Sequence, residues 1–143
     1  MDEKIYEKAI KLLSLRMHTT GELQRKLKAR GFKDQDIVPV LKELERLQFL
    51  DDQKFAEIFV DNLKRFKDFG FYGIKAKLLA RQVPSDIVES VLAEFFTAED
   101  ETKIGQRVVA KLKKRGRDSY EKLARALQSR GFRNQIISAV LKN

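Results

Sequence analysis

The sequence predicts an all-α fold made of three tandem three-helix repeats in an elongated, curved array. Only seven glycines and two prolines interrupt the 143 residues, the apolar residues follow a helical spacing, and one pattern occurs three times. Charged residues make up 36% of the chain and apolar residues 43%. This composition is typical of a folded protein and leaves little room for long loops.

The repeat is clearest between the two ends of the chain, where the same residue types return after 100 positions. In this way Leu23, Leu27, Gly31, Phe32, Ile37, Val40 and Leu41 recur as Leu123, Leu127, Gly131, Phe132, Ile137, Val140 and Leu141. A middle copy lies 51 residues after the first, at Ile74, Leu78, Gln82, Val83, Val88, Val91 and Leu92. The predicted repeats are residues 1–50, 51–96 and 97–143.

Residues of the types that begin helices keep the same register. Thr19, Gly70 and Ser119 precede the second helix of each repeat, and Asp34, Ser85 and Asn134 are predicted to cap the third. One three-helix repeat buries too little surface to be stable alone, so neighbouring repeats are expected to stack.

In the first repeat, a helix is predicted from about Asp2 to Met17, with Ile5, Ala9, Leu12 and Leu13 on its inward side. Thr19 and Glu22 fit a capping box at the start of the second helix. Gly31 is predicted to end that helix in the left-handed conformation, which costs glycine least. Phe32 then turns toward the core, and the third helix runs to about Leu47.

The second repeat begins at Asp51-Asp52, a carboxylate pair that is predicted to cap a helix rather than to act as an acid or base. Its first helix places Phe55, Ala56, Phe59, Val60 and Leu63 on one face. Gly70 and Gly73 are expected to bracket the next turn, and Pro84 is tolerated at the start of the third helix. The third repeat follows the same plan, with helices around 104–112, 123–127 and 135–142.

The charge of the chain is concentrated in its last third. Residues 101–143 hold 12 Lys or Arg against three Asp or Glu, whereas the first hundred residues carry equal numbers. Four of these cations, Lys103, Arg107, Lys111 and Lys114, follow a spacing that places them on one side of a helix. A surface of one sign attracts phosphate backbones, so the repeat is predicted to bind a polyanion. The predicted binding residues are Lys103, Arg107, Lys111, Lys113, Lys114, Arg115, Arg117, Lys122, Arg125, Arg130 and Arg133. The alternative is that the Lys and Arg stems only cover apolar surface.

Other residue types suggest no catalytic, metal or cofactor site. There is no Cys and only one His, which cannot form a typical zinc site, and His18 is expected to pack or to cap a helix end. No phosphate-cradling glycine loop or nucleophile motif occurs. The aromatic residues are expected in the core, with Phe69, Phe71 and Tyr72 as alternative stacking surfaces for bases.

No apolar run is long enough for a membrane span, and the N-terminus lacks the profile of a secretory signal. We therefore expect a cytoplasmic, monomeric protein without an enzymatic activity, a cofactor or a membrane partner.

Two segments of the chain form a specific combination. The first is Arg16-Met17-His18-Thr19-Thr20-Gly21-Glu22-Leu23, followed by Lys26-Leu27 and Arg30-Gly31-Phe32; the second is Leu50-Asp51-Asp52 with Phe55-Ala56. Together they resemble the RecX family of recombination regulators. The chain departs from the family pattern in the middle repeat, where the glycine turn is Gln82-Val83 and Leu63 stands at the place of an expected arginine, unless Arg65 substitutes for it. The resemblance implies a cytosolic bacterial protein of tandem three-helix repeats that binds the RecA recombinase filament and modulates, usually inhibits, its activity in DNA repair.

Two other functions remain open. The helix pairs at 23–41 and 123–141 could form a helix-turn-helix that binds duplex DNA directly. The chain could also be a helical scaffold that contacts only acidic proteins. Sequence-specific duplex binding would favour the first alternative, and an absence of binding to DNA or to recombinase filaments at physiological salt would favour the second.

Overall fold

The computed structural model describes residues 1–142, which form nine α-helices joined by short turns and contain no β-strand. The helices are α1 (Glu3–Leu15), α2 (Thr20–Ala29), α3 (Asp34–Arg46), α4 (Asp52–Phe66), α5 (Phe71–Ala80), α6 (Ser85–Phe95), α7 (Ala98–Lys114), α8 (Tyr120–Ser129) and α9 (Asn134–Leu141). We call α1–α3 unit 1, α4–α6 unit 2 and α7–α9 unit 3. The all-α prediction is confirmed.

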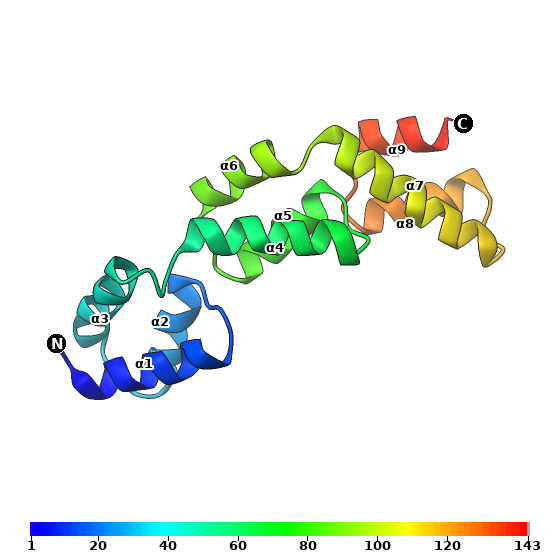
Figure 1. The fold of residues 1–143 in the computed structure, drawn as a ribbon. Helices are drawn as coiled ribbons and strands as arrows, with labels where there is room; N and C mark the ends of the chain where they lie inside the picture. The colour runs from blue at the N-terminus through cyan, green and yellow to red at the C-terminus, as the bar shows by residue number, and fades with distance from the viewer. Residues whose placement is uncertain (143) are drawn as a thin grey trace.

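The three units follow one another along a bent line, and the two ends of the chain lie at opposite ends of the molecule (Figure 1). The predicted elongated, curved array is therefore confirmed. None of the helices in residues 1–142 combines the length and the hydrophobicity that crossing a bilayer requires.

Local signals place most helix ends correctly. Thr19 and Glu22 form the predicted capping box of α2, and the Asp51 carboxylate accepts a hydrogen bond from the Lys54 amide at the start of α4. Gly31 has a φ of 94° after α2, and Gly131 has a φ of 82° after α8. Gln82 takes the same left-handed conformation in the middle unit, with a φ of 60°. The turn is thus preserved where its glycine is not.

Three predicted helix caps were wrong, and one glycine is placed differently. Asp34, Ser85 and Asn134 are each the first residue inside the third helix, and the extended residue before them is the cap. At those caps, Lys33, Pro84 and Arg133 make no side-chain bond to the helix amides, so side-chain capping was not the signal that set these ends. Gly73 lies inside α5 rather than at a turn.

The hydrophobic core is divided unevenly among the units. Unit 1 buries its own cluster around Ile5, Leu23, Ile37 and Leu44. Units 2 and 3 share one continuous cluster that runs from Phe55 to Ile137. Apolar burial is the main favourable term in folding, so units 2 and 3 form one body, whereas unit 1 is attached to unit 2 through contacts of another kind.

Candidate nucleic-acid interface

Two basic residues of helix α7, Arg107 and Lys111, face the end of α4 and the connection that follows it. Arg107 and Lys111 lie on adjacent turns and reach the same carboxylate, with Arg107 Nε 3.0 Å from Asp68 Oδ1 and Lys111 Nζ 2.8 Å from Asp68 Oδ2. Arg107 also donates to the Lys67 carbonyl at 2.9 Å. The spacing therefore did place these side chains together, at a position where they also join unit 3 to unit 2.

Among residues 1–142, four of the eleven predicted binding residues form ion pairs with acidic side chains. Arg107 and Lys111 bind Asp68, and Arg133 binds Glu101, which is fully buried. Lys103 pairs with Glu99 at 3.4 Å, but both side chains are more than two-thirds exposed. Such exposed pairs are weak and easily replaced, so Lys103 stays available to a ligand while Arg133 does not.

The other predicted cations gather around the end of α7 and along α8. Lys113, Lys114, Arg115, Arg117, Lys122 and Arg125 are all exposed. An open hollow of about 540 Å³ lies on α8, lined by Arg117, Lys122, Arg125, Arg130, Ala126 and Ser129. Part of the predicted site therefore forms a shallow basic surface at the far end of the array.

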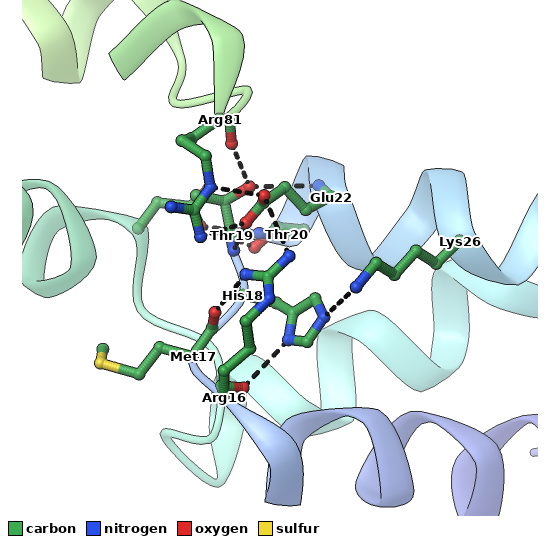
Figure 2. Close-up of polar contacts among 9 residues, drawn as sticks. Arg16, Met17, His18, Thr19, Thr20, Glu22, Lys26 and Arg81 are labelled. Atoms are coloured by element: carbon green, nitrogen blue, oxygen red, sulfur yellow. Dashed lines mark hydrogen bonds and ion pairs between the residues drawn. The ribbon is translucent and has the colours of Figure 1, made fainter. Parts of the chain in front are cut away.

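Part of the family resemblance, Thr19, Thr20 and Glu22, lies at the junction between units 1 and 2, which we call the first junction (Figure 2). Glu22 accepts a hydrogen bond from Arg81 Nε at 2.7 Å, and the Thr19 hydroxyl donates to the Arg81 carbonyl at 2.7 Å. Burial raises the pKa of Glu22, but the hydrogen bonds from Arg81 and the Thr19 amide outweigh it and lower the pKa overall. Glu22 is therefore an anion in this junction.

The second half of the motif completes the first junction. Asp52 Oδ1 accepts from the Thr20 amide at 2.8 Å and from the Thr20 hydroxyl at 3.2 Å. The guanidinium of Arg81 lies over the ring of Phe55, 4.8 Å from its centroid. The motif thus holds two units together through charges and helix-end amides rather than through a shared apolar core.

His18 is buried beside this junction in a defined protonation state. Its Nδ1 lies 3.0 Å from the Arg16 carbonyl, and its Nε2 lies 2.8 Å from Lys26 Nζ. Because a carbonyl only accepts and an ammonium only donates, Nδ1 carries the proton and Nε2 accepts. Burial lowers the pKa of His18 from its usual value of 6.5. The packing role predicted for His18 is confirmed, and the ring is neutral.

Acidification from about pH 7.5 to about pH 5.5 is expected to lower the free energy of unfolding through His18. Since its pKa is lower in the folded chain than the usual 6.5, the unfolded chain takes up the proton first as the pH falls. The free energy of unfolding begins to fall near pH 6.5 and stops falling below the pKa that His18 has in the folded chain. Urea unfolding followed by circular dichroism measures it, and His18→Gln is expected to depend less on pH than the native chain. Equal pH dependence in both proteins would contradict this role.

A second junction, between units 2 and 3, is built around Glu101. This carboxylate is fully buried and accepts from the Phe71 amide and the Arg133 amide, each at 3.0 Å, and from Arg133 Nε at 2.7 Å. The Arg133 guanidinium also lies 4.4 Å from the ring centroid of Phe71. Of the alternative stacking surfaces for bases, Phe71 is thus covered, while Tyr72 is exposed.

Both junctions use one arrangement. In each, the first amide of the second helix, at Thr20 or Phe71, donates to a carboxylate near the start of the next unit, Asp52 or Glu101. In each, the residue before the second helix also donates a hydrogen bond to a backbone carbonyl of the next unit. The Thr19 hydroxyl donates to the Arg81 carbonyl, and the Gly70 amide donates to the Arg130 carbonyl. Each of these carbonyls directly precedes a left-handed residue, Gln82 or Gly131. The repeated sequence therefore produces a repeated contact between units.

Two of the residues that organise this region, Asp68 and Glu101, were missed in the sequence. A signal existed for Glu101, because Ile104, Val108 and Leu112 follow it on the buried side of α7, and an acid there must find partners. Asp68 lies in a connection without periodicity and gave no such signal. Within residues 1–142, no group of three or more His, Asp or Glu residues could hold a metal ion.

Comparison with known proteins places this junction motif in a family. A family model described as "RecX, first three-helix domain" matches residues 6–44, and one described as "RecX, second three-helix domain" matches residues 51–92. The protein named regulatory protein RecX of Prosthecochloris aestuarii is 35% identical over 96% of this chain and 91% of its own length. The one of Geobacillus kaustophilus is 31% identical over 97% of this chain; the chain spans 53% of that relative's length.

A solved structure shares the fold. The crystal structure of RecX from Lactobacillus salivarius superposes with a TM-score of 0.89 over 98% of this chain and 94% of that chain, at 24% identity. At such identity the likeness concerns the fold alone. The two matched domains contain both halves of the motif that joins units 1 and 2, and with the identity to the Prosthecochloris protein they establish that this chain belongs to the RecX family.

Proposed function

We propose that this chain is a cytoplasmic regulator without catalysis of its own, which binds the RecA recombinase filament on DNA and inhibits its ATP hydrolysis and strand exchange. The RecX family resemblance suggests the recombinase, and the relatives' name, regulatory protein, supports a regulatory role. The observation that carries the proposal is the elongated array with its net positive charge concentrated in one terminal unit. A long molecule can follow a filament, with unit 3 at the phosphates and the less charged units against protein.

A titration tests the proposal directly. The protein is added to recombinase assembled on single-stranded DNA while ATP hydrolysis is followed, with DNA alone and recombinase alone as controls. A progressive fall in hydrolysis supports regulation of the filament. Binding only to one duplex sequence would instead favour the helix-turn-helix alternative. If the protein binds neither DNA nor the filament at physiological salt, the result would favour the other alternative, a helical scaffold that contacts only acidic proteins.

Reversing three exposed cations of unit 3, Lys114→Glu, Arg115→Glu and Arg117→Glu together, is expected to weaken filament binding at least about tenfold at roughly 0.1 M salt. The slope of log affinity against log salt should become shallower by about two, because a complex with fewer phosphate contacts releases fewer counterions. Fluorescence anisotropy of a labelled filament measures both quantities.

The matched control reverses three exposed lysines of unit 1, Lys4, Lys11 and Lys42. It changes the net charge equally but leaves unit 3 intact, so its slope should stay close to the native value. Equal losses in both variants would mean that net charge, and not the surface of unit 3, attracts the filament.

A further inference from the structure

The contact between α4 and α7 combines a strong and a weak attachment at one carboxylate. Arg107 is held by Asp68 at 3.0 Å and by the Lys67 carbonyl at 2.9 Å, with a longer contact of 3.5 Å to the Lys64 carbonyl. Lys111 is held by Asp68 alone among the residues that the structure describes, at 2.8 Å. Its side chain is 53% exposed. The two cations therefore differ in how readily they could leave Asp68.

Asp68 is an anion at neutral pH. Burial raises the pKa of its carboxyl, but hydrogen bonds from Lys111 and Arg107 outweigh it and lower the pKa overall. A carboxylate between an arginine and a lysine offers the same two acceptor oxygens as a nucleic-acid phosphate would offer. The other basic residues beside this point, Lys67 and Lys114, are exposed, so a phosphate chain could reach it without entering the core.

We infer that the seam between α4 and α7 is a phosphate-binding position that Asp68 occupies in the free protein, and that a nucleic-acid phosphate takes Lys111 from it. Arg107 keeps its carbonyl partners and holds the seam together during the exchange. Partly exposed ion pairs are weak, so the phosphate need displace only one such contact. This inference rests on the proposed function, because it adds one phosphate contact, that of Lys111, to the basic unit proposed to bind DNA.

Freeing the lysine tests the exchange. Asp68→Asn is expected to raise the affinity for a labelled oligothymidylate about five- to eightfold at roughly 0.1 M salt, and to leave the salt slope nearly unchanged because Lys111 contacts a phosphate in both complexes. In the double variant Asp68→Asn, Lys111→Gln, the affinity should return to the native value. Asp36→Asn, an exposed carboxylate of unit 1 with the same charge change, should alter it less than twofold. An unchanged or lower affinity of Asp68→Asn would overturn the inference.

A second comparison does not depend on the folding of the Asp68 variant. Lys111 and Lys114 lie three residues apart on α7, but of these two lysines Lys111 alone pairs with Asp68. Lys111→Gln should change the affinity less than twofold, because the lost phosphate contact is offset by the Asp68 pair that no longer has to break, but it should make the salt slope shallower by about one phosphate contact. Lys114→Gln should lower the affinity about five- to eightfold. Equal losses would show that Lys111 is not masked. If the native protein binds neither the oligothymidylate nor the recombinase–DNA filament at low salt, the proposed function fails as well; if it binds and only these differences are missing, the inference fails alone.

Discussion

Replacing Gly131 by alanine is expected to lower the free energy of unfolding by more than about 4 kcal/mol and to separate unit 3 from unit 2. Gly131 has a φ of 82°, and a Cβ there would overlap the amide nitrogen and Cα of Gly73. This is backbone that cannot move aside, because the Tyr72 amide donates to the Gly131 carbonyl at 2.8 Å across the same contact. Thermal and urea unfolding measure the loss.

The repeat supplies the control, Gly31→Ala. Gly31 occupies the equivalent place in unit 1 with a φ of 94°, but a Cβ there would meet no atom within 4 Å. Its replacement should cost only the left-handed strain, about 1–2 kcal/mol. Equal losses for the two variants would mean that backbone strain, and not the approach of the two units, determines the glycine at 131.

Glu101→Ala is expected to lower the free energy of unfolding by about 3–5 kcal/mol, because it leaves the Arg133 guanidinium and two amides without their common acceptor. The carboxylate is fully buried and serves the Phe71 amide, the Arg133 amide and the Arg133 side chain. Glu99→Ala removes an acid two residues away whose side chain is 79% exposed, and it should cost less than about 1 kcal/mol.

Hydrogen exchange locates the effect of Glu101→Ala. The core that units 2 and 3 share is separate from that of unit 1. Protection should therefore fall in α4 to α9 and persist in α1 to α3. A uniform loss across all nine helices within residues 1–142 would show that unit 1 depends on the second junction, contrary to the division of the core.

The local signals in the sequence were reliable where one residue decides one helix end. The capping box at Thr19 and the left-handed turn at Gly31 depend on contacts within a few positions, and both are confirmed. The caps predicted at Asp34, Ser85 and Asn134 failed. At the last of these, the preceding residue is fixed by a distant partner: the Arg133 amide donates to Glu101, which lies 32 positions earlier in the chain.

The sequence predicted which unit carries the excess of positive charge. It did not predict which of its basic side chains remain available for binding. The spacing of four placed Arg107 and Lys111 on one side of α7, and the structure brings both to Asp68. The spacing along one helix does not show which acidic residue of another unit will lie against that helix. For this reason the list of predicted binding residues contained both exposed cations, such as Lys114, and Arg133, which binds a buried carboxylate.

By itself, the sequence determined the helical class, the threefold repeat and the excess of positive charge in the last unit, because each depends on residue types and their spacing along the chain. Only the tertiary structure decided how the units join, through a polar first junction at Arg81 and a second junction with a shared core at Glu101. The physical reason is that an ion pair or a close backbone approach exists only when two surfaces meet. Which cations remain exposed follows from that meeting.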